Sequence, residues 1–367
     1  MQRSTRRTVL VAAAAAAAVG LGAVPAVAQP ADPSFTLAAP TGPSAVGSTV
    51  LQLTDEDRAD PWVPGEDRTL MVTMWYPTDE TGTAAPYLTP EESALFMGQV
   101  GNPGPDGYFA EVATNAVAGA EPVRGRLPLV MLSPGWSFPR ATLTGLAEEL
   151  ASQGYAVAAV GHNYEAPITL ADGTTNPCLA CEANPDGPTV TANRAADLSF
   201  VLDELTARGS EWRRHLDAGR VVVGGHSMGG SAAHAAVQTD DRFAAGFNLD
   251  GSMHDDEDAP VDVPFLLLGN ASNAVPGVDE SWGNAWAQMG DWKRWIRAEQ
   301  TTHSSFTDLA PFAKDLGVPL QEMDGDRALE LTRAVVTAFA DQELGCEDAP
   351  VLDGPTAEWP ELAFEMQ

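Results

Sequence analysis

The sequence predicts an α/β protein with a mostly parallel central sheet flanked by helices. From residue 127 onward, short runs rich in Val, Leu and Ile alternate with segments whose apolar residues recur at helical spacing, as in a parallel sheet with crossover helices. One of these runs, residues 221–223, leads through a glycine-rich turn directly into an alanine-rich segment. That arrangement is typical of a strand that passes sharply into a helix.

The first expected elements are two paired strands and an insertion. Residues 49–53 and 70–76 read as strands joined by a turn rich in proline and aspartate. Residues 89–123 combine a short helical start with the sequence GNPGPDG at 101–107. They predict an insertion between strands that can form part of a lid.

A regular alternation follows. The expected strands are all short, and all but the last are mostly apolar: 127–132, 155–160, 221–223, 243–249, 263–268 and 292–298. The expected helices are 143–153, 193–207, 231–237, 282–289 and 327–344, and residues 163–189 are expected to be a long loop. Early paired strands followed by this alternation fit the α/β-hydrolase fold.

One folded domain is expected behind an export signal. Residues 1–28 combine a basic start that holds a twin arginine, an alanine-rich apolar run and an A-x-A cleavage site, which predict a twin-arginine-type signal peptide. We expect residues 29–47 to be a flexible lead-in, and residues 48–367 to be a single domain with insertions near 89–123 and 163–189. The protein is therefore expected to be secreted, without a stable membrane anchor.

The charge balance restricts the partners. The 367-residue chain holds 51 Asp and Glu against 20 Lys and Arg, a formal net charge of −31. Such a surface repels nucleic acid and anionic membranes, and permits neutral, zwitterionic or insoluble uncharged substrates. We expect a monomer that uses no cofactor and no metal.

Three cysteines permit one disulfide in an oxidising compartment: Cys178, Cys181 and Cys346. The first two have C-x-x-C spacing, but no second pair and no histidine cluster supports zinc. A redox motif would need a helix after Cys178, and Pro185 and Pro188 argue against one. A structural bridge is the better interpretation, and its pairing stays open.

The segment Gly225-His226-Ser227-Met228-Gly229 matches G-x-S-x-G. In a nucleophile elbow the serine occupies a strained strand-to-helix turn, and small residues let the two elements approach closely. The alternative is a glycine-rich turn with a solvated serine. Because a strand precedes the motif and a helix follows it, we expect Ser227 to be the nucleophile.

The catalytic base must follow the serine in this fold. Of the six histidines, His254 and His303 lie beyond the elbow and its helix. His303 follows the last expected strand, where a loop carries the base, whereas His254 lies in the acidic segment MHDDEDAP, where solvation is expected. We therefore assign His303 as the base.

Two carboxylates compete for the third position. The loop after the strand at 263–268 offers none before Asp279. Asp250 directly follows the strand at 243–249 and precedes a glycine, and catalytic groups lie at the carboxyl ends of such strands. We assign Asp250 as the acid that orients the base and keep Asp279 as the alternative.

Two backbone N–H groups are needed for an oxyanion hole. Met228, directly after the serine, supplies the first. The segment Ser133-Pro134-Gly135-Trp136 supplies the second; Pro134 has no N–H, so the donor is Gly135 or Trp136, and we favour Trp136.

Arg194 and the acidic residues 255–258 are expected to have structural roles rather than catalytic or metal-binding ones. Arg194, near the start of an expected helix, is expected to form an ion pair rather than to act in catalysis. Residues 255–258 are all acidic but lack the alternating spacing of a calcium loop, which favours a solvated face over a calcium site.

Over residues 127–309 the chain resembles the plasma-type platelet-activating factor acetylhydrolases and their bacterial relatives. The resemblance rests on PLVMLSPGW, LASQGYAVAAVGH, RAADLSFVLDEL, GGHSMGG, FNLDGSM and THSSFTDL. In that family the acid follows the sixth strand, as Asp250 does here, 23 residues after Ser227 (250 − 227 = 23). A histidine is usual there at the position of Pro134. The SPGW and HSMGG segments are more similar to cutinases and polyester hydrolases, which carry their acid in the later loop, where this chain has Asn273.

These observations predict a secreted serine carboxylic-ester hydrolase that works through an acyl-enzyme. The resemblance implies short-acyl lipids or similar esters as substrates. A cutinase-like polyester hydrolase is the alternative within the same class, which leaves a small-molecule or a polymeric ester open as substrate. A catalytically silent extracellular binding protein on the same fold is the alternative from another class.

Overall fold

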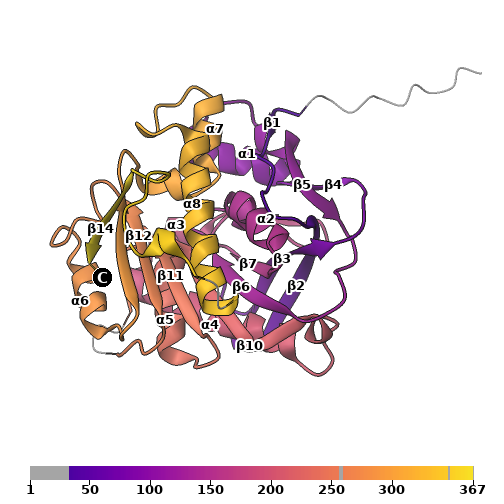
Figure 1. Cartoon of the computed structure of the whole chain (residues 1–367). Coiled ribbons are helices and arrows are strands. Elements are labelled where there is room, and N and C mark those ends of the chain that lie inside the picture. The colour runs from indigo at the N-terminus through magenta and orange to yellow at the C-terminus, as the bar shows by residue number, and fades with distance from the viewer. Residues whose placement is uncertain (1–32, 256–258, 346–347, 367) are drawn as a thin grey trace, which may run out of the picture. The chain divides into compact units, whose positions relative to one another are not determined.

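The computed structural model describes residues 33–255, 259–345 and 348–366; the expected signal peptide and Cys346 lie outside them. Its centre is a 12-stranded sheet in the order β1-β5-β2-β3-β7-β6-β10-β11-β12-β13-β14, with β4 paired to β5 (Figure 1). A parallel block runs through β7 (Ala156–His162), β6 (Leu127–Ser133), β10 (Leu216–His226), β11 (Ala245–Leu249), β12 (Phe265–Asn270) and β13 (Lys293–Ala298).

Antiparallel strands flank this block. On one side lie β3 (Asp67–Thr78) and β2 (Ala45–Ala59), and on the other β14 (Leu362–Met366). Every residue of β7, β11 and β12 is buried, as expected for strands covered on both faces. The carboxyl ends of the parallel strands meet at one edge of the sheet, and this edge holds the candidate site.

Helices cover both faces. In the view of Figure 1, α2 (Thr144–Ser152) and α8 (Gly325–Ala340) lie in front of the sheet and share one apolar core with it. Helices α4 (Gly187–Thr206), α5 (Met228–Thr239) and α6 (Glu280–Gln288) contribute to a second core on the other face. The predicted fold class, a mostly parallel sheet flanked by helices, is confirmed.

A third, aromatic core belongs to the first insertion. Helix α1 (Pro90–Gln99) and α7 (Leu309–Asp315) pack around Phe96, Phe109 and Phe312, whose rings contact one another. Residues 89–123 also hold β5 (Val112–Ala118), which pairs with β2 and was not expected from the sequence. Its inward residues alternate, but Ala and Asn between them hide the strand pattern.

The described part of the expected lead-in is packed against the domain. Within residues 33–47, β1 (Phe35–Thr36) pairs with β5 and Leu37 is buried. The Thr41 hydroxyl donates a hydrogen bond of 2.5 Å to Glu149 on α2. These contacts attach the segment to the domain, and short β4 (Ala84–Pro86) pairs with β5 nearby.

The second insertion is more ordered than a loop. It holds the hairpin β8 (Ile168–Thr169) and β9 (Thr175–Asn176), followed by α3 (Leu179–Ala183). The prediction that no helix follows Cys178 was therefore wrong. Pro185 lies beyond the end of α3, and Pro188 occupies the first turn of α4, where proline is tolerated because the first N–H groups of a helix have no helical acceptor.

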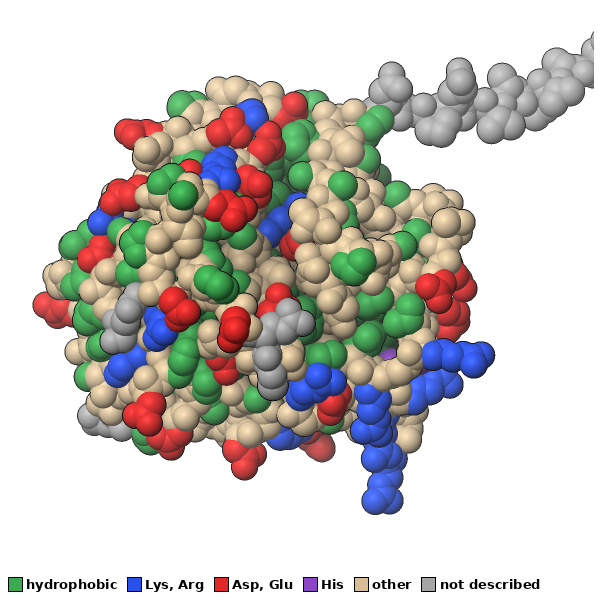
Figure 2. Space-filling view, viewed as in Figure 1, with side chains coloured by type: hydrophobic (Ala, Val, Ile, Leu, Met, Phe, Trp, Pro, Cys, Tyr) green, Lys and Arg blue, Asp and Glu red, His purple; other side chains and the backbone are tan. Residues whose placement is uncertain are grey.

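Cys178 and Cys181 form a disulfide, which settles the pairing that the sequence left open. In the described ranges, no helix has the length and apolar character needed to span a bilayer. Figure 2 shows acidic side chains scattered over the visible face, in keeping with the negative net charge.

Candidate active site

Ser227 lies in the turn between β10 and α5 with φ 56° and ψ −123°. A positive φ at a non-glycine residue is strained and is typical of a nucleophile elbow. The flanking glycines allow the close approach: a Cβ at Gly225 would lie 2.2 Å from the Ser133 carbonyl oxygen, and a Cβ at Gly229 only 1.9 Å from it. Met228 is the first residue of α5, so its N–H has no acceptor one turn earlier in the helix.

Three side chains from separate strand ends form one line of hydrogen bonds. His303, in a 3₁₀ turn (His303–Phe306) after β13, has Nε2 2.8 Å from the Ser227 hydroxyl. Its Nδ1 lies 2.7 Å from Asp250 Oδ2, directly after β11. The His303 side chain is 46% exposed and the Asp250 side chain only 1%, so the imidazole is accessible while its carboxylate partner is shielded from water.

Asn270, at the end of β12, also holds the Asp250 carboxylate. Its backbone N–H donates to Asp250 Oδ1 at 2.7 Å, and its side-chain amide donates to Oδ2 at 2.6 Å. A role for Asn270 was not predicted from the sequence, in which only carboxylates were candidates at this strand end. A polar residue that closes a fully buried strand was the available signal.

The alternative residues lie in the same cavity, of about 220 Å³, but have other partners. Asp279 caps the N-terminus of α6, where it accepts hydrogen bonds from Ser281 and from the Ser252 hydroxyl. Among the described residues, no hydrogen bond joins Asp279 to His303. The His254 backbone N–H donates to Ser231, which fixes the loop that carries the histidine.

His226, inside the elbow, contacts the candidate base. Its Nε2–H donates to the His303 carbonyl oxygen at 2.7 Å, and the two rings lie 4.7 Å apart. Burial, reinforced by the proximity of His303, lowers the pKa of His226 to about 3, so the ring is neutral at ordinary pH. The position of His226 in the turn was predicted from the sequence, but its contact with His303 was not.

Arg194 supports the loop from Ser133 to Trp136. Arg194 donates from Nη1 to the Pro134 carbonyl at 2.6 Å and from Nε to Glu165 at 2.6 Å. Its guanidinium also lies 5.8 Å from the centre of the Trp136 ring. The predicted ion pair of Arg194 is thus present, and it supports the loop on which we expect the second oxyanion donor.

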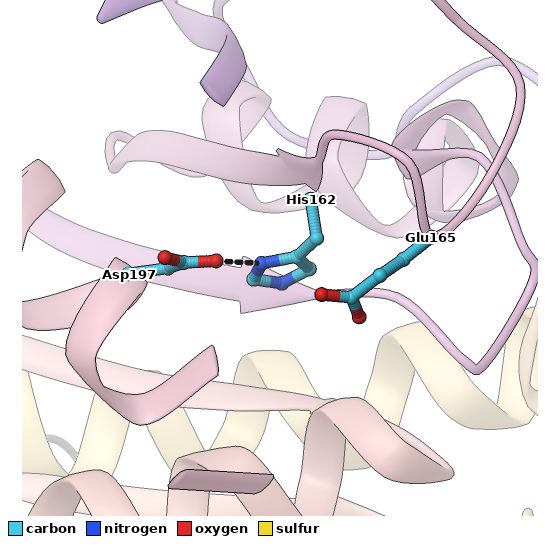
Figure 3. Close-up of side chains that lie close together, drawn as sticks. All are labelled: His162, Glu165 and Asp197. Carbon is cyan, nitrogen blue, oxygen red and sulfur yellow. Dashed lines mark hydrogen bonds and ion pairs between the residues drawn. The ribbon is translucent and has the colours of Figure 1, made fainter. Parts of the chain in front are cut away.

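Figure 3 shows the neighbouring group of His162, Glu165 and Asp197, whose ligand atoms lie within 4.8 Å of one another. Such a set could hold a metal, but these atoms already have partners. Asp197 Oδ2 accepts from His162 and from Arg68, each at 2.7 Å, and His162 Nε2 lies 2.9 Å from the Ser133 hydroxyl.

Two buried arginines, Arg68 and Arg194, contact Glu165. Burial by itself raises the pKa of the Glu165 carboxyl, but the charges of Arg194, His162 and Arg68 outweigh that effect and lower it. The group is therefore a self-neutralised ion-pair network and does not fit a cation.

One acidic residue differs from its prediction. Asp255 was expected on a solvated face, but its side chain is 5% exposed and lies 2.6 Å from Nδ1 of the buried His234. The carboxylate is buried because the imidazole provides a partner. Residues 256–258 lie outside the described residues.

Comparison with solved structures decides the family. A ferulic acid esterase from Streptomyces cinnamoneus superposes with a TM-score of 0.84 at 39% identity, covering 91% of this chain and 100% of that one. The chain belongs to the carboxylic ester hydrolases of the α/β-hydrolase superfamily. No protein-family model matches this esterase.

Curated relatives of the esterase fall into the two groups suggested by its sequence. A probable 1-alkyl-2-acetylglycerophosphocholine esterase from Arthroderma benhamiae is 26% identical over 92% of this chain and 96% of that protein. A cutinase from Thermobifida alba is 28% identical over 60% of this chain and 64% of the cutinase. A bis(hydroxyethyl) terephthalate hydrolase from Streptomyces coelicolor is 26% identical over 53% and 52%. The resemblance to both groups is confirmed.

Proposed function

We propose that this esterase hydrolyses its substrates through Ser227, His303 and Asp250. The observation that carries the proposal is the unbroken line of hydrogen bonds from the buried Asp250 carboxylate through His303 to the Ser227 hydroxyl. A serine hydroxyl is a weak nucleophile until an adjacent base removes its proton. The base in turn needs a partner that fixes its tautomer, and Asp250 supplies one.

The reaction follows from these positions. His303 Nε2 takes the Ser227 proton as Oγ attacks the ester carbonyl carbon, and the imidazolium that forms is stabilised by Asp250. The N–H groups of Met228 and Trp136 stabilise the oxyanion. His303 then returns its proton to the departing alcohol, which leaves an acyl-Ser227. Water, deprotonated by His303, attacks that acyl group, releases the acid and restores the serine.

The cavity around Ser227 favours small substrates that carry no negative charge. Its volume is about 220 Å³, and Ser252, Asn273 and Asp279 line it together with the triad. The Asp279 carboxylate disfavours anionic groups by repulsion, as does the net charge of the whole chain. We propose short-acyl lipids or similar esters as substrates, and the similarity to the alkyl-acetylglycerophosphocholine esterase supports this choice.

A cutinase-like activity on polyesters is the second candidate. It is favoured by the Ser133–Trp136 segment and by the similarity to the cutinase and the terephthalate hydrolase. An assay of the purified enzyme on short-acyl phospholipids, triglycerides, feruloyl esters and polyester film compares the candidates. The proposal expects the highest kcat/KM on a short-acyl lipid; the highest activity on film would favour the second candidate.

We further propose that the protein is exported through the twin-arginine route, loses residues 1–28 and works as a monomer that needs no cofactor. N-terminal sequencing of secreted protein should begin near Gln29. Retention of residues 1–28 in the secreted form would contradict the proposed cleavage.

Ser227 is tested most simply with p-nitrophenyl acetate and a phosphonate inhibitor. Ser227→Ala should lose activity by several orders of magnitude, as removal of a triad serine does elsewhere. Mass spectrometry should find the phosphonate on Ser227 of the wild-type enzyme. Labelling of another serine would reject the assignment.

A further inference from the structure

A second cavity, of about 430 Å³, lies beside β2 and β3, and none of the described residues that line it also lines the cavity at Ser227. Its walls include the buried apolar side chains of Met71, Trp75 and Leu88. Val50, which is 50% exposed, and Gln52 line it on the outer side, where Gln52 accepts a hydrogen bond from the Ala171 N–H of the second insertion. The cavity is therefore mainly apolar, and solvent can reach it past Val50.

One cation lines this cavity. Within the described part of the chain, Thr73 Oγ1, which accepts from Nε at 2.7 Å, is the only hydrogen-bond partner of the Arg140 side chain, and no carboxylate oxygen lies within 4.0 Å of its nitrogens. Burial lowers the pKa of the Arg140 guanidinium, with Glu92 opposing that effect. Arg140 lines the cavity, and among the described residues its Nη1 and Nη2 groups have no hydrogen-bond acceptor.

Two other arginines, both fully buried, are paired with carboxylates. Arg68 contacts three carboxylates, and Arg194 is paired with Glu165 at 2.6 Å. A desolvated charge without a partner is destabilising, and a buried arginine is therefore usually paired. Buried Arg333 likewise has no ion pair among the described residues, but its Nη1 and Nη2 donate to the Ala39 and Ala38 carbonyls. The half-buried Arg140 donates only to Thr73, so its charge is available to a ligand.

Glu92 limits what the ligand can be. Its carboxylate lines the same cavity but accepts hydrogen bonds from the Thr89 and Thr169 N–H groups, at 2.9 and 2.7 Å, rather than from Arg140. This second charge repels anions, so one negative charge next to Arg140 is tolerated better than two. The walls at Met71, Trp75 and Leu88 require the rest of the ligand to be apolar.

We propose that this cavity binds an organic monocarboxylate, with the carboxylate on the Arg140 guanidinium and the apolar body against Met71, Trp75 and Leu88. A guanidinium fork matches the two oxygens of a carboxylate. Carboxylates of this type are what a carboxylic ester hydrolase releases, so the site can hold the acid product away from Ser227. The proposal rests on the family activity and not on the assigned triad.

The test is isothermal titration of the full-length mature enzyme with 3-phenylpropanoate at low chloride. We expect saturable binding with one site, at least tenfold weaker binding of neutral 3-phenylpropanamide, and unchanged binding after Ser227 has been blocked with a phosphonate. Arg140→Gln should weaken binding about tenfold or more, the loss of a charge-assisted hydrogen-bond pair. The isosteric Thr73→Val is a second test, in case Arg140→Gln folds poorly. It removes the hydroxyl that anchors the guanidinium and should weaken binding several-fold.

Matched controls separate the outcomes. Arg220→Gln removes an exposed arginine paired with Asp217 and should leave binding unchanged. Arg140→Gln should keep the activity on p-nitrophenyl acetate. The proposal is overturned if 3-phenylpropanoate does not bind, if the amide binds equally well, if phosphonate labelling abolishes binding, or if sulfate alone occupies the site. Because the readout is binding, a failed triad assignment would leave this test intact.

Discussion

The His226 side chain is hydrogen-bonded to the backbone of His303: Nε2–H donates to the carbonyl oxygen of the candidate base at 2.7 Å. The elbow that presents Ser227 therefore also anchors the residue that must deprotonate it. We infer that His226 is a positioning residue, which acts through the orientation of His303 and contacts no reacting atom.

Replacement of His226 should lower kcat more than it changes KM. His226→Phe keeps a ring beside His303 but loses the donor, and small misplacements of a base cost roughly ten- to a hundredfold in rate. His226→Gln, which restores an N–H near the position of Nε2, should recover most of kcat. Steady-state kinetics on p-nitrophenyl acetate tests this, and equal rates for the wild type and the Phe variant would exclude the positioning role.

The same residue should make the fold sensitive to acid. The pKa of His226 is lowered from its usual 6.5 to about 3 in the folded state, so between these pH values the unfolded chain binds a proton that the folded chain does not. Its contribution to stability is full above pH 6.5 and is lost as pH falls toward 3. His226→Phe should reduce the slope of unfolding free energy against pH by up to about 1.4 kcal/mol per unit in that window. Urea denaturation from pH 4 to 6 measures the slope, and identical slopes would refute this prediction.

Arg194 should affect stability and catalysis separately. Arg194→Met leaves Glu165 with less compensation and should cost about 3–5 kcal/mol of unfolding free energy, the usual effect of breaking a buried pair. The double variant Glu165→Gln, Arg194→Met should recover part of that stability. The double variant should keep the low kcat of Arg194→Met, because in both variants the Pro134 carbonyl lacks the Arg194 donor.

Denaturation curves and kcat on both Arg194 variants test this separation. Recovery of kcat together with stability in the double variant would show that Arg194 has a structural role only.

The disulfide between Cys178 and Cys181 should contribute only modestly to the free energy of unfolding. It closes a loop between residues only three positions apart, and loop-entropy arguments give about 2 kcal/mol for so short a ring. Cys178→Ser with Cys181→Ser should therefore lower the unfolding free energy by about 2 kcal/mol or less. Titration of the unfolded, unreduced protein should find one thiol, Cys346; three would contradict the pairing.

The sequence predicted the parallel block well because strands buried on both faces read as continuous apolar runs, as in β7 and β12. It failed at β5 and at α3. The buried side chains of β5 are small, and α3 follows a cysteine whose sulfur accepts a hydrogen bond from the Cys181 N–H. Such elements depend on tertiary contacts rather than on a local pattern.

In the candidate site, chain order and strand ends were enough to bring Ser227, Asp250 and His303 together. Supporting residues were not predictable in the same way. Asn270 acts through two hydrogen bonds to Asp250, and His226 through one to the His303 backbone. Sequence spacing does not specify such contacts. The four strand ends at β10, β11, β12 and β13 converge only once the sheet forms.

Asn270 gives a test of that support. Asn270→Ala removes the amide donor to Asp250 Oδ2 and keeps the backbone donor to Oδ1. A charge-assisted hydrogen bond is worth about 1.5–3 kcal/mol, so the carboxylate should be held less firmly and kcat should fall about tenfold. An unchanged kcat would mean that His303 and the residue-270 backbone N–H are sufficient to orient Asp250.

The most direct measurement compares kcat/KM of Asp250→Asn and Asp279→Asn, with melting temperature as the control for folding. Asp250→Asn should favour the wrong tautomer of His303 and cost up to about 10⁴ in kcat. Asp279→Asn should cost less than about tenfold, because Asp279 caps α6 and contacts Ser252 and Ser281. The two results differ by roughly 4 kcal/mol in barrier. A large loss of kcat/KM in Asp279→Asn, together with nearly wild-type kcat/KM in Asp250→Asn, would contradict the assignment and place the acid after β12.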